Sequence, residues 1–266
     1  MLKRISLCVT SSLVLACAPA AHAHIVDNVL EHSAPNAALQ LTPIGSHESG
    51  VLGKSAAEIV AYHAASQRVL TVNARSGEID ILDASDPTQP QKIGAISAGG
   101  DKEINSVAVR PDGLAVAAVQ QADKTGNGEA LFFNAATGQE LGRVGVGALP
   151  DNVHLTADGR HALVANEGEP SDALNAEGTA YLKDPEGSIS VISLPADVAA
   201  PALNDVHTAG FTAFDTADLN PSIRVFGPSE HHNLPSRDFE PEYISSADGK
   251  AYATLQENNA IAVIDI

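Results

Sequence analysis

The sequence has 266 residues, with 33 acidic side chains against 15 basic ones and a formal net charge of −18 at pH 7. This acidity argues against a nucleic-acid partner, because phosphate backbones bind surfaces rich in lysine and arginine. The two cysteines, Cys8 and Cys17, both lie within the first 23 residues. A chain that has lost those residues can form no disulfide, so its stability must come from packing, with a bound metal as a further contributor.

The first 23 residues have the pattern of a secretory signal peptide. Residues 1–4 include two basic side chains, residues 5–18 are mostly apolar, and residues 21–23 read Ala-His-Ala. This pattern predicts cleavage after residue 23 and export to the periplasm or the cell exterior. The apolar stretch is shorter than the roughly 20 residues that span a bilayer, and we expect no transmembrane segment in the mature chain. The alternative is a lipoprotein signal, with Cys17 as the lipidated N-terminus.

Residues 24–56 form an N-terminal segment of mixed composition, in which residues 39–41 are a candidate closing strand for a later sheet. From residue 57 onward, apolar and polar side chains alternate with a period of two, which is typical of β-strands. Four segments then repeat one design of apolar strand, polar turn, second apolar strand and polar or acidic loop. They are residues 58–83, 105–134, 152–194 and 240–266.

The turns of these segments support the repeat. Asp-Gly pairs lie within residues 110–113, 157–160 and 247–250, between the first two strands of three segments, and residues 64–67 take that place in the first segment. Asp and Gly accept the backbone geometry of tight turns. Small sheets repeated along a chain bury their faces against one another. The predicted fold class is therefore all-β, with a β-propeller over residues 57–266.

Two long inserts interrupt the regular pattern, at residues 168–186 and 202–239. The first is acidic and separates the second and third strands of its segment. The second includes residues 211–219, a candidate short helix, and His231 next to His232. Structureless loops of this length are uncommon in compact domains, and those that occur are functional or disordered.

The number of predicted blades does not complete a ring. At about 45 residues per blade, four segments and one more built from the N-terminal segment fall short of six or seven blades. The chain also stops at Ile266, directly after a predicted strand at residues 261–264. We therefore expect an incomplete propeller, truncated at the C-terminus of this chain and belonging to a longer protein. A ring of four or five blades is the alternative.

Acidic residues gather in loops that should open on one face of a propeller. Loops that enter first strands and loops that leave second strands lie at the same mouth of the central channel, and the first insert grows from that face. The candidate metal ligands are Glu167, Glu169, Asp184, Glu186, Glu240 and Glu242. Such oxygen-rich sets suit a hard cation such as Ca²⁺. The alternative is that these acids solvate loops, cap turns or pair with basic side chains.

Other chemistry has weaker support. His231 and His232 are poor partners for one metal, because adjacent residues of a strand face opposite sides. His154 lies in a first strand and is best interpreted as a structural histidine. No nucleophile motif of the G-x-S-x-G type and no phosphate-binding glycine loop occurs. Any catalysis would therefore be hydrolysis assisted by carboxylate-held metal ions.

Several ordered motifs resemble one known family. They lie at residues 165–170, 184–188, 224–228, 239–244 and 255–263. Together they resemble the choice-of-anchor I family of exported and surface propellers, over most of residues 57–266. The resemblance implies a seven-bladed, YncE-like propeller within a longer chain, often joined to a cell-surface anchoring signal. Some members carry an alkaline phosphatase-like label, and the acidic motifs are similar to those of calcium-dependent propeller phytases.

Three functions follow from these observations. The first is an exported binding or scaffold module with calcium at the channel mouth and an unidentified ligand or surface partner. The second is a calcium-dependent phosphoesterase, in which Glu167, Glu169, Glu240 and Glu242 hold ions against a phosphate ester. Lys183, Arg224 and Arg237 would supply its positive charge. The third is a metal-free interaction propeller.

Overall fold

The computed structural model describes residues 36–39, 42–226 and 234–266. The chain divides into two units, Met1–Ser46 and His47–Ile266, and the strands of the described residues lie in the second unit. The predicted signal peptide, Cys17 and the His231–His232 pair lie outside the described residues. Leu39, from the candidate closing strand, is in no strand, and residues 40 and 41 lie outside the described residues.

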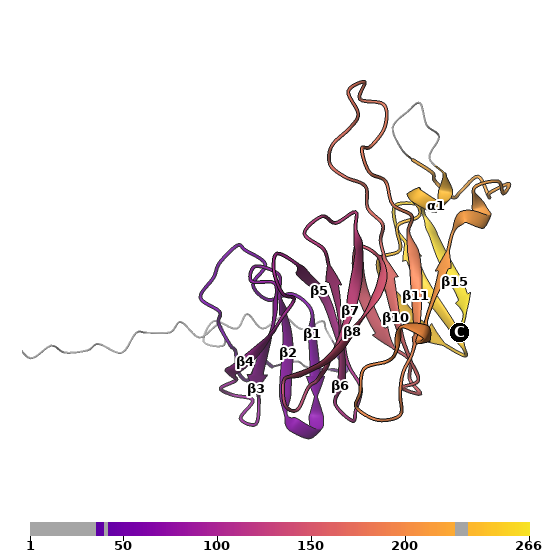
Figure 1. Cartoon of the computed structure of the whole chain (residues 1–266). Helices are drawn as coiled ribbons and strands as arrows, with labels where there is room; N and C mark the ends of the chain where they lie inside the picture. Colours follow the sequence, from indigo (N-terminus) through magenta and orange to yellow (C-terminus); the bar gives the residue numbers. More distant parts are fainter. Residues whose placement is uncertain (1–35, 40–41, 227–233) are drawn as a thin grey trace, which may run out of the picture. The chain divides into compact units, whose positions relative to one another are not determined.

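The described residues form four antiparallel sheets, in which strands adjacent in the sequence are neighbours in space (Figure 1). The first sheet contains β1 (Val60–His63), β2 (Arg68–Asn73), β3 (Glu78–Asp83) and β4 (Gln91–Ser97). The second contains β5 (Glu103–Val109), β6 (Leu114–Gln120), β7 (Asn127–Asn134) and β8 (Gln139–Ala148). The third contains β9 (Pro150–Leu155), β10 (His161–Asn166), β11 (Ser188–Ser193) and β12 (Val206–Gly210). The fourth contains β13 (Ile244–Ala247), β14 (Lys250–Leu255) and β15 (Ala260–Asp265).

Consecutive sheets pack face to face through apolar cores. Leu70, Ile79 and Leu131 belong to a buried cluster shared by the first two sheets. A second cluster joins the second and third sheets, and a third cluster joins the third and fourth. This repeated packing of three- and four-stranded meanders confirms the predicted all-β, propeller-type fold. The seven-blade count stays a prediction.

Tight turns of the predicted kind join the first two strands of each sheet. In the fourth sheet Asp248 and Gly249 both have positive φ, at 51° and 73°, which is the geometry of a type I′ hairpin turn. In the first sheet a short 3₁₀ helix, η2 (Ala64–Ser66), takes that place and ends at Gln67, whose φ is 52°. The local turn chemistry therefore sets the register of the meanders.

The second insert differs from the prediction. Residues 206–210 form β12, which pairs with β11 along its whole length. The segment Val-His-Thr-Ala-Gly lacks large apolar side chains, so its pattern did not indicate a strand. The predicted helix at residues 211–219 is only η4 (Thr212–Phe214), and two further short helices are η3 (Leu203–Asp205) and α1 (Pro235–Asp238).

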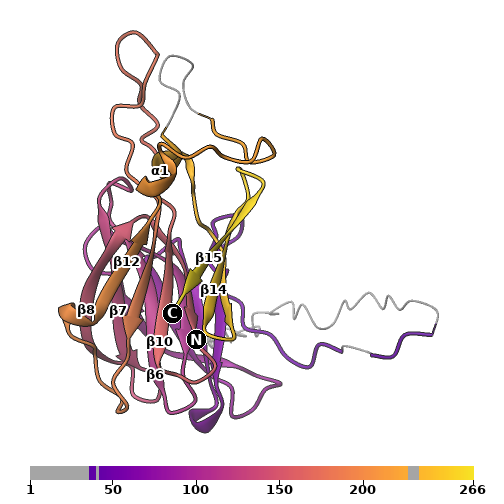
Figure 2. The ribbon, with the colours of Figure 1, turned by 90° about the vertical axis from the view of Figure 1, so that its right-hand side faces the viewer.

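The fourth sheet is smaller than the others among the described residues. It has three strands there, with β13 and β15 at its two edges. Ile261 and Val263 on β15 are 64% and 56% exposed. Figure 2 shows β14 and β15 beside the other sheets, with α1 and the long β10–β11 insert at one end.

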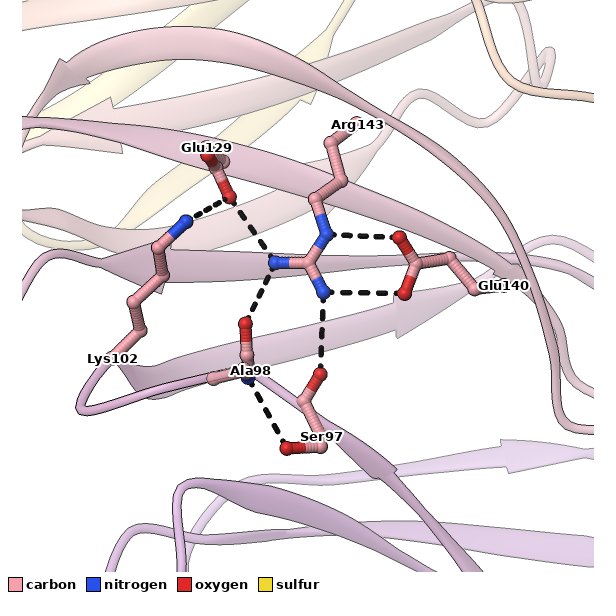
Figure 3. Close-up of polar contacts among 7 residues, drawn as sticks. Ser97, Ala98, Lys102, Glu129, Glu140 and Arg143 are labelled. Atoms are coloured by element: carbon pink, nitrogen blue, oxygen red, sulfur yellow. Dashed lines mark hydrogen bonds and ion pairs between the residues drawn. The ribbon is translucent and has the colours of Figure 1, made fainter.

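Arginines tie neighbouring sheets together (Figure 3). Arg143 on β8 donates to the carbonyl oxygens of Ala98 at 2.7 Å and Ser97 at 3.3 Å, both at the end of β4. It also binds Glu140 and Glu129, and Lys102 lies 2.8 Å from Glu129. The first and second sheets are thus joined by a polar network as well as by their apolar core.

Candidate functional site

Three chain segments that carry the acidic motifs meet at one end of the third and fourth sheets. A Cβ atom on Gly187 would overlap the carbonyl oxygen of Phe239 and lie 3.1 Å from that of Glu167. Gly168 has a φ of +71°, and a Cβ atom on Gly168 would lie 2.6 Å from the backbone nitrogen of Gly187. The glycines therefore let the segments around residues 167, 187 and 239 stack backbone against backbone.

Gly187 is thus a sensitive position. We expect Gly187→Ala to lower the free energy of unfolding by about 1 to 3 kcal/mol, the usual cost of forcing an extra methyl group into a packed site. The matched control is Gly145→Ala, because a Cβ on Gly145 has no atom within 4 Å. Urea unfolding of both variants measures the difference. Equal stability of the two variants would show that the three segments are not closely packed.

Buried neighbours hold Glu240 and Glu242 in place. Phe239 is 3% exposed, and its ring lies edge-on to that of Phe211, with centroids 5.5 Å apart. The backbone nitrogen of Glu242 donates to the carbonyl oxygen of Thr254 at 3.1 Å. The two glutamates therefore project from a segment anchored in the core on both sides.

Glu167 is held equally firmly. It follows directly after β10, and its backbone nitrogen donates to the carbonyl oxygen of Leu149 at 2.8 Å. The next residue, Gly168, donates to Ala148 at 3.1 Å. These hydrogen bonds continue the antiparallel pairing of β9 and β10 beyond the end of β10. They fix the backbone position of Glu167.

Burial and like charge act together on these carboxyl groups. Burial, followed by the charges of Asp151, Glu169, Glu242 and Glu240, raises the pKa of Glu167 to about 8. Burial, followed chiefly by the charges of Glu169 and Glu257, raises the pKa of Glu240 to about 7. The pKa of Glu242 is raised by burial and by Glu257. We call Glu167, Glu169, Glu240 and Glu242 the acidic edge.

The other two predicted ligands, Asp184 and Glu186, have different surroundings from each other. Burial raises the pKa of Asp184, and the positive charge of Arg237 opposes that change. The Oδ1 atom of Asp184 is buried and has no hydrogen-bond partner among the described residues. Glu186 is exposed and lines a groove of about 590 Å³ together with Asn127 and Ser188. The structure therefore brings four of the six acids together, with Asp184 beside them.

Asp151 and Lys124 extend this site. The pKa of Asp151 is raised by burial and by the charge of Glu58. The Nζ atom of Lys124 lies 2.7 Å from Oε2 of Glu169 and 3.2 Å from Oδ1 of Asp172. Sequence reasoning missed Lys124. No local pattern marks a lysine that pairs with an acid 45 residues away.

The acids are not arranged as a finished metal site. Among residues 36–39, 42–226 and 234–266, no group of three or more His, Cys, Asp or Glu side chains is placed to hold a metal ion. The donors are nevertheless all oxygen, which is the chemistry that calcium prefers. A cation would have to draw the side chains together, and the calcium role of the six residues stays a prediction.

Basic side chains near the site have other partners. Lys183 forms an ion pair with Asp123, and the guanidinium of Arg224 lies 5.4 Å from the centre of the Phe226 ring.

The Nε2 atom of His154 lies 3.0 Å from Oγ of Ser246, and burial lowers the pKa of His154. A neutral histidine that joins β9 to β13 fits the structural role predicted for it.

Solved structures resemble the chain in fold. A putative 6-phosphogluconolactonase from Bacteroides uniformis has 10% identity and a TM-score of 0.50, covering 85% of this chain and 55% of that one. Hydrazine synthase from Kuenenia stuttgartiensis has 14% identity and a TM-score of 0.39, covering 79% and 64%. A nidogen/laminin complex has 11% identity and a TM-score of 0.41, covering 77% and 58%. The chain thus spans less than two thirds of each of these proteins.

No curated protein sequence matches the chain. Within the part of the chain that the structure describes, no helix has the length and hydropathy needed to cross a membrane. Residues 58–266, which include all four sheets, match the choice-of-anchor I domain. On that match, the chain belongs to the choice-of-anchor I family.

Proposed function

We propose that the protein is an exported, propeller-type binding or scaffold module that binds calcium at its acidic edge. Membership of the choice-of-anchor I family indicates an exported or cell-surface module. The binding role and the calcium are our inference from the chemistry of the acidic edge.

The observation that carries the proposal is the electrostatic state of Glu167 and Glu240. Their pKa values of about 8 and about 7 mean that burial and like charge oppose ionisation near neutral pH. Among the described residues, Lys124 is the basic side chain that forms an ion pair with the acidic edge, through Glu169. A divalent cation would relieve the remaining repulsion, because a nearby positive charge favours the ionised carboxylates.

The chemistry of the donors selects the kind of cation. Glutamate oxygens from two loops suit calcium, which accepts six to eight oxygen ligands in flexible geometry, with water completing the shell. Magnesium demands a stricter octahedral arrangement at shorter distances. The four carboxylates lie near one another but do not form a rigid octahedral site, so they favour calcium over magnesium.

Calcium binding is testable through stability, because a ligand that binds only the folded state raises the free energy of unfolding. Thermal unfolding of residues 24–266 is recorded in EDTA and then in millimolar calcium. We expect a higher midpoint in calcium, by an amount equivalent to about 2.7 kcal/mol when calcium is 100 times its Kd.

The matched variants locate the effect. Glu167→Gln and Glu240→Gln should abolish the calcium-dependent rise, whereas Glu177→Gln, an exposed acid of the β10–β11 insert, should retain it. A cooperative transition with the same midpoint in EDTA and in calcium would refute the calcium proposal and leave a metal-free interaction module. Magnesium in place of calcium tests the selectivity.

The phosphoesterase alternative lacks a supporting contact among the described residues. A phosphate ester beside four acids needs nearby positive charge, but Lys183 pairs with Asp123 and Lys124 pairs with Glu169. Arg224 is placed against an aromatic ring, and the positive charge of Arg237 acts on Asp184. We therefore rest the proposal on binding and not on hydrolysis.

A further inference from the structure

The first and fourth sheets each have one face that belongs to no junction between sheets. The four sheets follow one another in chain order, and apolar clusters fill the three junctions between consecutive sheets (Figure 1). Among the described residues, these clusters contain no side chain from the far face of the first sheet or from the far face of the fourth sheet. Both far faces are therefore open to a partner.

The far face of the fourth sheet is apolar and exposed. Every second residue of β14 and β15, such as Ala253 and Ala262, packs toward the third sheet. Because side chains alternate along a strand, Tyr252, Ile261 and Val263 point to the other side. They are 39%, 64% and 56% exposed, and Tyr252 lies directly opposite Val263 in the register of the two strands. We call these three residues the fourth-sheet face.

The far face of the first sheet has a similar apolar part. Ile59 and Ala61 pack toward the second sheet, so Val60 and Tyr62 on β1 point away from it. Val60 and Tyr62 are 61% and 53% exposed. We call these two residues, with their neighbours on β2 and β3, the first-sheet face. Exposed apolar patches of this kind mark interaction sites in soluble proteins.

The charged centre of the first-sheet face already has partners. Asp80 belongs to this face, because it pairs across the strands with Thr71, which in turn pairs with Val60. The Nζ atom of Lys92 lies 2.7 Å from Oδ1 of Asp80, and Nδ2 of Asn73 donates to Oδ2 at 3.3 Å. A partner can therefore cover this face without leaving Asp80 as a buried, unpaired charge.

We propose that a second copy of this chain covers both faces, so that two copies form one closed ring of eight sheets. The fourth-sheet face of each copy packs against the first-sheet face of the other. This contact continues an interface that the chain already makes three times, in which one face of a sheet meets the opposite face of the next sheet. Propellers typically have four to eight blades, and a head-to-tail contact that closes after two copies has two-fold symmetry.

The ring would place the two acidic edges together. Sheet order continues in the same sense across each junction, so the two-fold axis runs along the central channel. Both acidic edges then open at the same mouth. A ligand that reaches both would bind more tightly than one held by a single copy, because the second contact is intramolecular.

The mass of the purified protein in solution is the direct test. Light scattering after gel filtration, in EDTA and at micromolar concentration, should give a dimer. Val263→Lys and Tyr62→Lys should each raise the Kd of the dimer by roughly a hundredfold or more, because each dimer would bury two unpaired ammonium groups. Leu182→Lys is the matched control, at a 63% exposed leucine of the β10–β11 insert, and should leave the Kd unchanged.

A mixture of the two variants distinguishes the ring from other dimers. A mixed pair has one junction between two native faces, formed by the fourth-sheet face of the Tyr62→Lys copy and the first-sheet face of the Val263→Lys copy. Both junctions are damaged in a dimer of either variant alone. The mixture should therefore dimerise more tightly than either variant. Thermal unfolding checks that each variant folds, and Ile261→Lys replaces Val263→Lys if that variant does not.

Three results would overturn the ring. A wild type that stays monomeric at micromolar concentration leaves both faces to other occupants, such as further sheets of a longer protein. A dimer that Val263→Lys weakens and Tyr62→Lys does not is a contact between two fourth sheets. Masses above the dimer mean that the junctions do not close. All of these measurements are made in EDTA, so they leave the calcium proposal untouched whichever result is obtained.

Discussion

Replacement of Arg110 by alanine is expected to lower the free energy of unfolding by about 1 to 3 kcal/mol, the cost of leaving buried hydrogen-bond acceptors without their donor. Arg110 is 8% exposed. Its Nε and Nη2 atoms each donate to one carboxylate oxygen of Asp112 at 2.8 Å. This bidentate contact lowers the pKa of Asp112.

The remaining donors of Arg110 reach the third sheet. Nη1 donates to the carbonyl oxygens of Gly159 at 3.1 Å and Pro195 at 2.9 Å. Nη2 donates to those of Ala196 and Asp197, both at 3.2 Å. One side chain thus ties the β5–β6 turn to the β9–β10 turn and to the chain after β11. Its loss would leave several oxygens at this junction without a donor.

Two variants make the test specific. Arg110→Lys should lose most of the same stability, because an ammonium group cannot present five donors in a planar fork. Arg160→Ala, an exposed arginine of the β9–β10 turn, is the control and should change stability by less than about 0.5 kcal/mol. Urea unfolding at pH 7 measures all three. A loss below 1 kcal/mol for Arg110→Ala would mean that the apolar core alone holds the two sheets together.

The second large effect is on the pH dependence of stability in the absence of calcium. Glu167 and Glu240 have pKa values of about 8 and about 7 in the folded protein, raised above the usual 4.5. Between pH 4.5 and about 8 the folded protein therefore binds more protons than the unfolded chain. The contribution of these two groups to the free energy of unfolding therefore falls as the pH rises through this window.

The size of this fall is moderate because both groups are partly exposed. One pKa unit corresponds to about 1.4 kcal/mol at full effect, and screening by water reduces it, so we expect ~1 to 3 kcal/mol for the two groups together. Urea unfolding in EDTA at about pH 5 and about pH 8.5 measures the change. Millimolar calcium should reduce it, because a bound cation favours the ionised acids.

The double variant Glu167→Gln/Glu240→Gln isolates the contribution of these acids. It should lose most of the fall with pH and be more stable than the wild type at about pH 8.5 in EDTA. His154, whose pKa is lowered by burial, destabilises the protein as the pH falls below its usual 6.5, and it acts equally in both proteins. If the free energy of unfolding changed with pH in parallel for the wild type and the double variant, Glu167 and Glu240 would not have raised pKa values in the folded protein.

The strands and their turns followed from local patterns. Period-2 alternation places β2 and β3 correctly, because strand residues alternate between the two faces of a sheet. The strands β6 and β10 coincide with the second apolar strands of their repeated segments. The Asp-Gly pair at residues 248 and 249 adopts the positive φ values that a two-residue hairpin turn needs. The convergence of the loops around residues 167 and 240 followed from the order of strands in a meander. These features depend on neighbours in sequence or on topology.

The strand β12 and the contact between Lys124 and Glu169 depended on residues that are far apart in the sequence. Residues 206–210 become β12 because the free edge of β11 supplies hydrogen-bond partners, although their own side chains do not favour a strand. Lys124 meets Glu169 only because the second and third sheets stack side by side.

The amino-acid sequence by itself determined the family, the repeated meander and the set of acidic loops, because motif order, side-chain alternation and turn residues are local properties. Only the tertiary structure decided which acids lose water and face one another. It placed Glu167 and Glu240 in the half-buried acidic edge, directed Glu186 outward, and set Lys124 against Glu169. The physical reason is that desolvation and charge–charge interaction depend on distances and burial across the fold, which adjacent residues do not specify.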